Sequence, residues 1–236
     1  MLDLENILKN NTYPGRGIII GKSQNGVNAM IAYFIMGRSE NSRNRVFERF
    51  AGGMRTKAFD ESKISDPSLI IYNPYLAFKN KDIITNGDQT NTIYDYLQNG
   101  KTFEDALRMR CFEPDEPNFT PRISAILDYN TSNKDFTYKL SILKSGNEKG
   151  TNCKRFFYEY ESQNGVGHFI HTYEKDGNPI PSFTGEPEEI AIPNTAKEFS
   201  NIIWNSLNND NKVSLFVRTV NLKDYTNEEI IVNKNK

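Results

Sequence analysis

Two apolar stretches separated by a short polar turn open the chain. Residues 15–22 and 27–37 are rich in Ile, Ala, Phe and Met, and the turn between them ends in Asn25-Gly26. An Asn-Gly pair between two strand-like stretches is the strongest local signal for a β-hairpin. The pattern therefore predicts a hairpin whose second strand leads into a polar segment at residues 37–45.

Shorter strand-like stretches follow this hairpin. Gly52-Gly53 marks a turn between two segments with weak strand character. Beyond that turn, apolar residues bounded by Asn, Pro and Gly predict strands at 68–72, 75–78 and 82–85. The chain is therefore expected to be mainly β before its first long helix.

Two helices are predicted next, each with its own N-terminal signal. Asp88 stands where a capping side chain is expected, and apolar residues follow at helical spacing until Asn99-Gly100. Thr102, with Asp105 three residues later, has the pattern of a capping box for the second helix. Three prolines within residues 113–122 then exclude both a helix and a central strand.

The second half consists mostly of strands. Apolar and aromatic runs predict strands at 123–129, 136–143, 156–160, 167–173 and 213–220, and a helix at 195–207. That helix has an apolar stripe wide enough to require a sheet beneath it. The order of elements indicates an α+β chain with helices outside two stacked sheets, not a doubly wound sheet. We expect one domain over residues 1–236, with a short helix or loose arm at 1–12 and a partly frayed tail at about 227–236.

Composition narrows the range of partners. The 236 residues include 29 Lys and Arg against 30 Asp and Glu, and a net charge of −1 argues against nucleic-acid binding through bulk charge. The sequence has no run of about 18 apolar residues, so no membrane span is expected. The N-terminal residues do not have the pattern of a secretion signal. Cys111 and Cys153 have no metal-ligand spacing, and we interpret them as reduced thiols of a cytoplasmic protein.

The polar segment at residues 37–45 is the first candidate site. It holds three arginines among short polar residues, namely Arg38, Ser39, Arg43, Asn44 and Arg45. Guanidinium groups with hydroxyl and amide donors suit a phosphate, which takes several charge-assisted hydrogen bonds. A solvent-exposed charged loop is the alternative interpretation of this segment taken alone.

A second group of candidates lies at the start of the first predicted helix of the pair. Asn86, Gly87, Asp88 and Thr90 lie at this point, where free backbone amides favour an anion. Plain helix capping by Asp88 and Thr90 is the competing interpretation.

Glu113 and Arg122, at the two ends of the proline-rich loop, are the third pair of candidates. A rigid surface linker is the alternative interpretation of that loop. His168 and His171 lie three residues apart on a predicted strand and so face opposite sides, and we expect no metal pair there. Sequence motifs for dinucleotide, P-loop, zinc-protease or serine-hydrolase sites are absent.

Several pieces of the chain, taken in order, match the pattern of a known family. They are Gly15-Arg16 with the Arg38 segment, Asn73-Pro74-Tyr75-Leu76-Ala77, Asn86-Gly87-Asp88-Gln89-Thr90-Asn91-Thr92-Ile93, and Glu113 with Thr120-Pro121-Arg122-Ile123-Ser124-Ala125, with a weaker match at Thr172-Tyr173-Glu174. In these pieces, which cover roughly residues 13–128 well, the chain resembles the archaeal-type IMP cyclohydrolases. These are stand-alone enzymes that close the last ring in purine synthesis.

The resemblance implies both a fold and a reaction. The fold is a four-layer αββα sandwich of two stacked, largely antiparallel sheets, similar to the N-terminal nucleophile hydrolases but without their processed nucleophile. The reaction is the cyclisation of 5-formamidoimidazole-4-carboxamide ribonucleotide to inosine monophosphate with loss of water, using no metal and no other cofactor. The expected partner is a small purine nucleotide, and no nucleic acid or membrane. A homo-oligomer stays open, with the aromatic-rich strands of the second half as a candidate interface.

The resemblance and the chemistry together assign roles to the candidates. Glu113 is expected to transfer protons, and Arg122 to orient it or polarise the formyl oxygen. Tyr75 is a further catalytic candidate, and Arg16 a further binding candidate. The remaining substrate-binding candidates divide between the phosphate or ribose (Arg38, Ser39, Asn44 and Arg45) and the base or sugar (Asn86, Gly87, Asp88 and Thr90).

The chain departs from the family's pattern in three ways. The arginine segment is longer, so Arg43 is an extra cation without an assigned role, and residues 1–12 and about 144–165 are additions. Phe78 stands where the family members have Tyr. Because a missing phenol at that position would remove a proton donor, a non-catalytic purine-nucleotide-binding protein is one alternative. A hydrolase of formamides or amides on the same fold is another.

Overall fold

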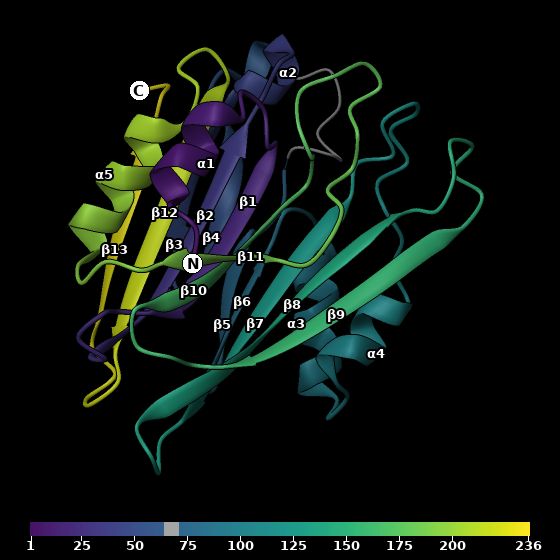
Figure 1. Cartoon of the computed structure of the whole chain (residues 1–236). Coiled ribbons are helices and arrows are strands. Elements are labelled where there is room, and N and C mark those ends of the chain that lie inside the picture. Colours follow the sequence, from purple (N-terminus) through teal and green to yellow (C-terminus); the bar gives the residue numbers. More distant parts are fainter. Residues whose placement is uncertain (64–70) are drawn as a thin grey trace.

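Two antiparallel sheets stacked face to face form the centre of the molecule (Figure 1). The computed structural model describes residues 1–63 and 71–236. The first sheet has the order β11 (Glu188–Ala191), β10 (Val166–His171), β1 (Arg16–Lys22), β2 (Asn28–Met36), β12 (Lys212–Asn221) and β13 (Asn227–Asn233). The second has the order β3 (Arg45–Phe50), β4 (Gly53–Ala58), β5 (Tyr75–Phe78), β6 (Lys81–Thr85), β7 (Arg122–Asn130), β8 (Asp135–Ser145) and β9 (Cys153–Glu161). Neighbouring strands in these sheets pair antiparallel throughout.

The hairpin predicted at the start of the chain is confirmed. β1 pairs with β2 over its whole length, from Arg16 opposite Ile35 to Lys22 opposite Ala29. Gly26 in the turn has a φ of +73°, a backbone conformation that residues with a side chain rarely adopt. The Asn-Gly pair therefore fixes the register that carries the end of β2 to the polar segment.

Helices cover the outer faces of both sheets (Figure 1). They are α1 (Leu4–Asn10), α3 (Gln89–Gln98), α4 (Phe103–Arg108) and α5 (Ala196–Ser206). The described residues also include the short helix α2 (Glu40–Arg43), which buries no residue and lies at one end of the sandwich, and a 3₁₀ turn at Glu61–Lys63. One core cluster joins α1 and α5 to the first sheet, a second joins α3 and α4 to the second sheet, and the third fills the space between the sheets. The layers therefore run helix, sheet, sheet, helix, which is the α+β sandwich expected from the sequence.

Local sequence signals explain where the helices begin. The hydroxyl of Thr102 accepts a hydrogen bond from the backbone N–H of Asp105, and the backbone N–H of Thr102 donates one to the carboxylate of Asp105. The predicted capping box is therefore present. The polar segment after β2, expected to be a loop, contains the short helix α2 with its own capping box between Ser39 and Ser42.

The ends of the chain are more ordered than the sequence predicted. Residues 1–12 include α1, whose Leu4 and Leu8 are buried in the core cluster shared with α5, so the alternative of a loose arm is wrong. Most of the partly frayed tail predicted at about 227–236 is ordered as well, because residues 227–233 form strand β13 beside β12. Residues 234–236 follow the strand. The apolar residues of β13, Ile230, Ile231 and Val232, are consecutive and so show no strand periodicity. Their strand conformation depends on the pairing with β12.

Two further predictions have other outcomes. The short strand β11 was not anticipated, because its charged sequence Glu-Glu-Ile-Ala shows little apolar character. The strand predicted at 68–72 falls mostly on residues 68–70, which lie outside the described residues.

The candidate residues gather at one end of the sandwich. β1, β3 and β7 begin at this end, while β2 and β6 finish there and lead into the polar segment and α3. Antiparallel pairing of this kind places the starts of some strands beside the ends of their neighbours. Among the described residues, no helix is long and apolar enough to cross a membrane.

Candidate active site

A cavity of about 260 Å³ opens at this end of the sandwich. Its wall combines the start of β1, the polar segment after β2, the proline-rich loop and the segment after β10. The lining residues are Tyr13, Arg16, Arg38, Ser39, Asn41, Ser42, Glu113, Asp115, Asn118, Thr120, Tyr173 and Ile180. We call this cavity the arginine pocket.

Glu113 is the buried acid of the arginine pocket. The residue is 3% exposed, and no hydrogen bond to its carboxylate is found in the described part of the chain. Burial raises the pKa of Glu113, and the opposing attraction of Arg16 and Arg122 does not cancel this effect. A carboxyl group with a raised pKa and no fixed partner is suited to proton transfer near neutral pH.

Two arginines with unused donors lie near Glu113. Arg16 and Arg45 are 9% and 0% exposed. Nε of Arg45 donates to the carbonyl oxygen of Ser42 at 2.8 Å, but within residues 1–63 and 71–236 both of its terminal nitrogens lack a partner, as does Nε of Arg16. Burial and the nearby Arg16 lower the pKa of Arg45. Because unpaired buried charge is costly, these donors indicate a site for an anionic or acceptor-rich ligand.

The turn before α3 holds Arg122 near Glu113. Its Nη1 donates to Oε1 of Gln89 at 2.6 Å and lies 2.7 Å from a carboxylate oxygen of Asp88. A Cβ atom on Gly87 would lie 2.4 Å from Nη1 of Arg122 and 3.5 Å from Oε1 of Glu113. Only glycine lets the backbone approach these groups so closely. The structure thus brings Gly87, Glu113 and Arg122 together, as the sequence predicted.

Asp88 does not cap α3, so the capping prediction is wrong. Its side chain makes no cap hydrogen bond and instead forms ion pairs with Arg110 at 2.5 Å and Arg122 at 2.7 Å. Burial opposes the charge on Asp88, but the two arginines outweigh it and lower its pKa. Asp88 therefore positions Arg122 and does not line the pocket.

Asn86 and Thr90 stabilise the turn before α3 through internal hydrogen bonds. Asn86 accepts a hydrogen bond from the backbone of Ile123 and donates one to the carbonyl of Pro121, both at 2.9 Å. The hydroxyl of Thr90 lies 2.6 Å from that of Thr85. Both residues are fully buried and do not line the arginine pocket.

The polar segment splits between the pocket and another surface. Arg38 lies at the pocket, where it donates to Asp176 at 2.6 Å and to the carbonyl of Gly177 at 2.8 Å, with its guanidinium 5.1 Å from the ring centre of Tyr13. Ser39 also lines the pocket while capping α2.

Asn44 and Arg43 are directed elsewhere. Asn44 exchanges two hydrogen bonds with the backbone of Asp60 and lines a separate hollow. Arg43 donates to the carbonyl of Gly37 and to the side chain of Asn211. The structure therefore does not bring Asn44 to the arginine pocket, and it gives the extra cation Arg43 a role in holding the segment.

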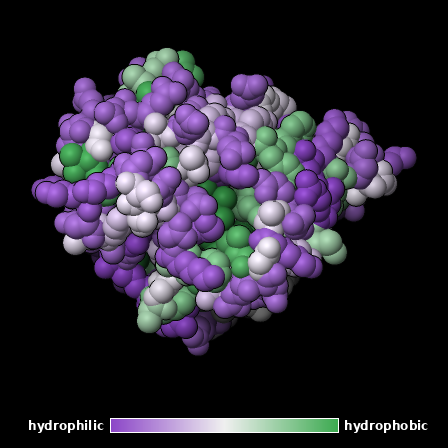
Figure 2. Space-filling view, turned by 90° about the horizontal axis from the view of Figure 1, so that it is seen from below, coloured by the Kyte–Doolittle hydropathy of each residue, from purple (hydrophilic) through white to green (hydrophobic). Residues whose placement is uncertain are grey.

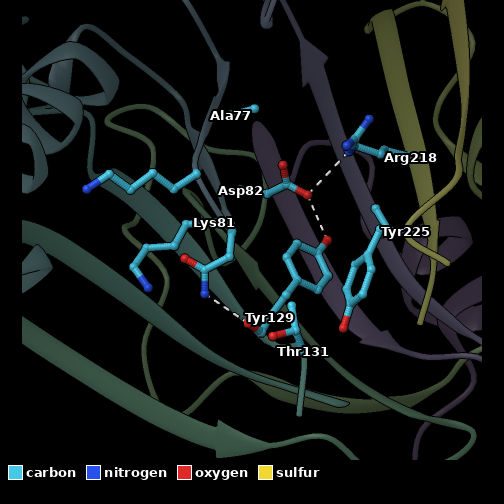
Figure 3. Close-up of a pocket in the computed structure, with 10 residues that line it drawn as sticks. Ala77, Lys81, Asp82, Tyr129, Thr131, Arg218 and Tyr225 are labelled. Atoms are coloured by element: carbon cyan, nitrogen blue, oxygen red, sulfur yellow. Dashed lines mark hydrogen bonds and ion pairs between the residues drawn. The ribbon is translucent and has the colours of Figure 1, made fainter. Parts of the chain in front are cut away.

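Tyr75 pairs with Ile84 near the pocket end of β6, but its hydroxyl points along the sandwich into a second polar cluster. Its hydroxyl donates to Asp82 at 2.7 Å, and Tyr129 donates to the same carboxylate at 2.7 Å. Arg218 completes the cluster at 3.3 Å and, with Asp82 and Tyr129, lines a second cavity of about 340 Å³ (Figure 3). Figure 2 shows that the face seen from below is hollowed, with apolar residues visible inside. Tyr75 does not line the arginine pocket.

The two cavities differ in how their charges are satisfied. Asp82 accepts three hydrogen bonds, and Arg218 also pairs with Glu229 at 2.6 Å. At the arginine pocket, by contrast, Nε of Arg16 and both terminal nitrogens of Arg45, which lies behind the lining residues, have no hydrogen-bond partner among the described residues, and no hydrogen bond to the carboxylate of Glu113 is found there. Since buried polar groups are normally hydrogen-bonded, the arginine pocket is the better candidate for an active site.

Several pocket residues were missed from the sequence. Tyr13 and Tyr173 stack with their ring centres 5.7 Å apart, and the hydroxyl of Tyr173 lies 2.6 Å from that of Thr120. Burial raises the pKa of Tyr173 to about 12, against the opposing effect of Arg16. The segment Thr172-Tyr173-Glu174 matched the family weakly, and that match was the only sequence signal for Tyr173. Asp115 and Asn118 gave none, since an irregular loop has no periodicity to read.

The histidines and cysteines lie outside the pocket. His168 contacts the hydroxyl of Tyr138 at 2.7 Å, whereas His171 is buried against Phe169. Within the described ranges, no group of three or more His, Cys, Asp or Glu side chains is arranged to hold a metal ion.

Comparisons with known proteins show which family this chain resembles. A family model described as "IMP cyclohydrolase-like protein" matches residues 13–225. A protein of Methanococcus aeolicus named IMP cyclohydrolase is 28% identical over 194 residues, covering 71% of this chain and 92% of that protein. A protein of Methanococcus maripaludis with the same name is 26% identical over 199 residues, covering 78% of this chain and 92% of that protein.

Proposed function

The chain belongs to the IMP cyclohydrolase-like family, and from this premise we propose that it is an IMP cyclohydrolase. It would cyclise 5-formamidoimidazole-4-carboxamide ribonucleotide to inosine monophosphate, with loss of water. The observation that supports this most strongly concerns Arg45 and Glu113: in residues 1–63 and 71–236, neither the terminal nitrogens of Arg45 nor the nearby carboxyl of Glu113 has a hydrogen-bond partner. We place the enzyme in the cytoplasm, where its substrate would be made.

The reaction suits a pocket built only from side chains. The carboxamide nitrogen attacks a formyl carbon of the same molecule, so the entropic cost of joining two reactants is absent. The protein needs to hold the two groups in the reactive conformation and to move protons. Positioned acid–base groups contribute about 10²–10⁴-fold in rate.

The pocket offers groups for each of these tasks. Glu113, with its raised pKa, would carry the proton between the attacking nitrogen and the departing water. Arg122, fixed by Gln89 and Asp88, would orient Glu113 or polarise the formyl oxygen. Arg16 and Arg45 would donate hydrogen bonds to the phosphate or carbonyl oxygens of the nucleotide. Arg38, at the pocket rim, would bind the oxygens nearest to solvent.

Phe78 does not weaken this proposal. Its ring packs on Tyr94 of α3, with the ring centres 5.3 Å apart, on the outer side of the second sheet. A tyrosine at position 78 would have the same backbone position, which is not among the residues that line the arginine pocket. Two other phenols, those of Tyr13 and Tyr173, lie in the pocket wall.

A second candidate function is a hydrolase that releases formate from the same substrate. The carboxyl of Glu113 could equally activate a water molecule, which gives this alternative a specific basis. A purine-nucleotide sensor without turnover is a third, although Phe78 no longer argues for it.

Incubation of the purified chain with the formamido nucleotide separates these functions. Ring closure is followed by ultraviolet absorbance, and the products are identified by chromatography. Inosine monophosphate as the sole product supports the cyclohydrolase. Release of formate would support the hydrolase, and tight binding without conversion would support the sensor.

A further inference from the structure

The two sheets have four edge strands, and three of them are engaged within the chain. Asn233 of β13 bridges to β3, accepting from the backbone N–H of Phe47 at 2.8 Å and donating to its carbonyl at 3.1 Å. At β11, the backbone N–H of Leu2 donates to the carbonyl of Glu189 at 2.7 Å. The edges of β3, β13 and β11 are therefore occupied, at least in part, by other segments of the same chain.

The backbone of the fourth edge, β9, has no such cover among the described residues, although two of its side chains reach other segments: Arg155 donates to the carbonyl of Arg110 at 2.6 Å and Tyr158 to that of Gly185 at 3.0 Å. In residues 1–63 and 71–236, no strand pairs with β9 except β8, which pairs with it from Thr137 opposite Glu161 to Ser145 opposite Cys153. The register is continuous, and residues 153–161 include neither proline nor glycine. Natural proteins protect a free edge with charged side chains, proline, a bulge or a covering segment, because its unpaired backbone groups invite another strand. β9 has charged side chains of both signs, which a partner of complementary charge can pair. β9 is nine residues long, about 30 Å of extended backbone.

The side chains of β9 are suited to contact with another strand. Phe156 is 39% exposed, and Tyr158 and Tyr160 are half-buried on the same face of the strand. Glu159, on the other face, has a side chain that is 67% exposed. The strand thus presents aromatic surface and charge along the same open edge, and Figure 1 shows it at the outer margin of the second sheet.

The sequence of β9 is complementary to itself about its middle residue, Phe157. In an antiparallel pair of identical strands centred there, residues equally distant from Phe157 stand opposite each other. Arg155 then faces Glu159, Phe156 faces Tyr158, and Lys154 faces Tyr160. Each opposed pair lies on the same face of the strand, as a two-fold axis requires, and no pair joins like charges.

We propose that the edge of β9 is the dimer interface of this protein, with a second copy of the chain as its partner. The two copies pair antiparallel about a two-fold axis at Phe157, which joins the two seven-stranded sheets into one continuous sheet. The backbone ladder supplies affinity, and the Arg155–Glu159 and aromatic pairs fix the register. The arginine pocket of each copy is built from other elements, so neither site needs the partner.

The oligomeric state of the full-length protein gives the first test. Light scattering after size-exclusion chromatography is expected to give twice the 27.1 kDa of the chain. Glu159→Arg places two arginines opposite each other on both sides of the axis, and weakens the dimer by about tenfold or more. Glu148→Arg, the same change in charge in the turn before β9, leaves the dimer intact. Ring-closing activity is expected to be unchanged in both variants.

Crosslinking tests the register. In a Cys111→Ser, Cys153→Ser background, Phe157→Cys places two thiols across the axis, and oxidised glutathione should join them as a covalent dimer. Glu159→Cys in the same background should stay uncrosslinked, because its counterpart in the other copy is Arg155, four residues away from the equivalent position. A monomer at tens of micromolar wild-type protein overturns the proposal. So does a dimer that tolerates Glu159→Arg and fails to crosslink through residue 157.

Discussion

Arg45 is a buried charged side chain whose burial lowers the stability of the folded protein. It is fully buried near another arginine, and only its Nε has a hydrogen-bond partner among the described residues. A methionine is shorter and would fill only part of this space, but it would carry no unpaired charge. Retaining the guanidinium makes physical sense if a ligand supplies the missing acceptors.

Replacing Arg45 with Met should therefore stabilise the empty protein while it weakens substrate binding. We expect the free energy of unfolding in urea to rise by about 1–3 kcal/mol, because an unpaired buried charge is removed. The Michaelis constant should rise at least about tenfold with a smaller effect on turnover. Arg43→Met is the matched control, since Arg43 has partners and lies outside the pocket. Loss of stability together with an unchanged Michaelis constant would show that Arg45 is structural.

Glu113→Gln should act on turnover instead. The amide keeps the size of the side chain but cannot exchange protons at neutral pH, so the turnover number should fall by about 10²–10⁴-fold. Binding of inosine monophosphate, measured by calorimetry, should change little. Glu116→Gln, in the same loop but exposed, should be neutral. A Glu113→Gln enzyme with normal turnover would remove this carboxyl from the mechanism.

At the scale of elements, the turn between β6 and α3 decides how close Arg122 comes to Glu113. Gly87→Ala would place its Cβ 2.4 Å from Nη1 of Arg122, and we expect activity to fall at least about tenfold because small displacements of catalytic groups are costly. Gly100→Ala is the control. It lies at the end of α3 with nothing within 4 Å of the added carbon, and its φ of +70° costs stability but not activity. Equal activity losses in both variants would contradict a local effect at Arg122.

Elements with strong local signals could be predicted from the sequence. The Asn25-Gly26 hairpin and the Thr102 capping box have short-range chemical causes, and both are present. β13 could not be predicted, because its residues become a strand only by pairing with β12. The capping role of Asp88 failed for a related reason. Arg110 and Arg122, distant in the sequence, attract its carboxylate away from the helix end.

The charged residues of the candidate site could be predicted from the sequence, but the aromatic residues that line it could not. Glu113 and Arg16 were found because charged residues next to matched motifs stand out in a sequence. Tyr13 and Tyr173 were missed, because they reach the pocket only through the pairing of β1 with β10. Tyr75 was misplaced, since the motif that contains it gives no information about which end of the sandwich its hydroxyl faces.

At the scale of the whole molecule, a buried neutral histidine links stability to pH. Burial lowers the pKa of His171 to about 4, against a weaker opposing hydrogen bond to the backbone of Tyr173. In the unfolded chain His171 takes up a proton near pH 6.5, whereas in the folded protein it is protonated only near pH 4. The free energy of unfolding therefore falls as the pH falls through this range.

Urea unfolding at pH 7 and pH 5 measures that effect. We expect the wild type to lose about 2 kcal/mol from this group between the two pH values. His171→Phe, which keeps an aromatic ring against Phe169 and Phe183, should lose correspondingly less. The same loss in both proteins would assign the pH dependence to other groups.

The most direct measurement is a crystal structure of the chain grown with inosine monophosphate. We predict that the nucleotide occupies the arginine pocket beside Glu113 and Tyr173, with an oxygen of the ligand within hydrogen-bond distance of the terminal nitrogens of Arg45. A nucleotide bound in the second cavity near Asp82, or one that leaves Arg45 unpaired, would contradict that prediction.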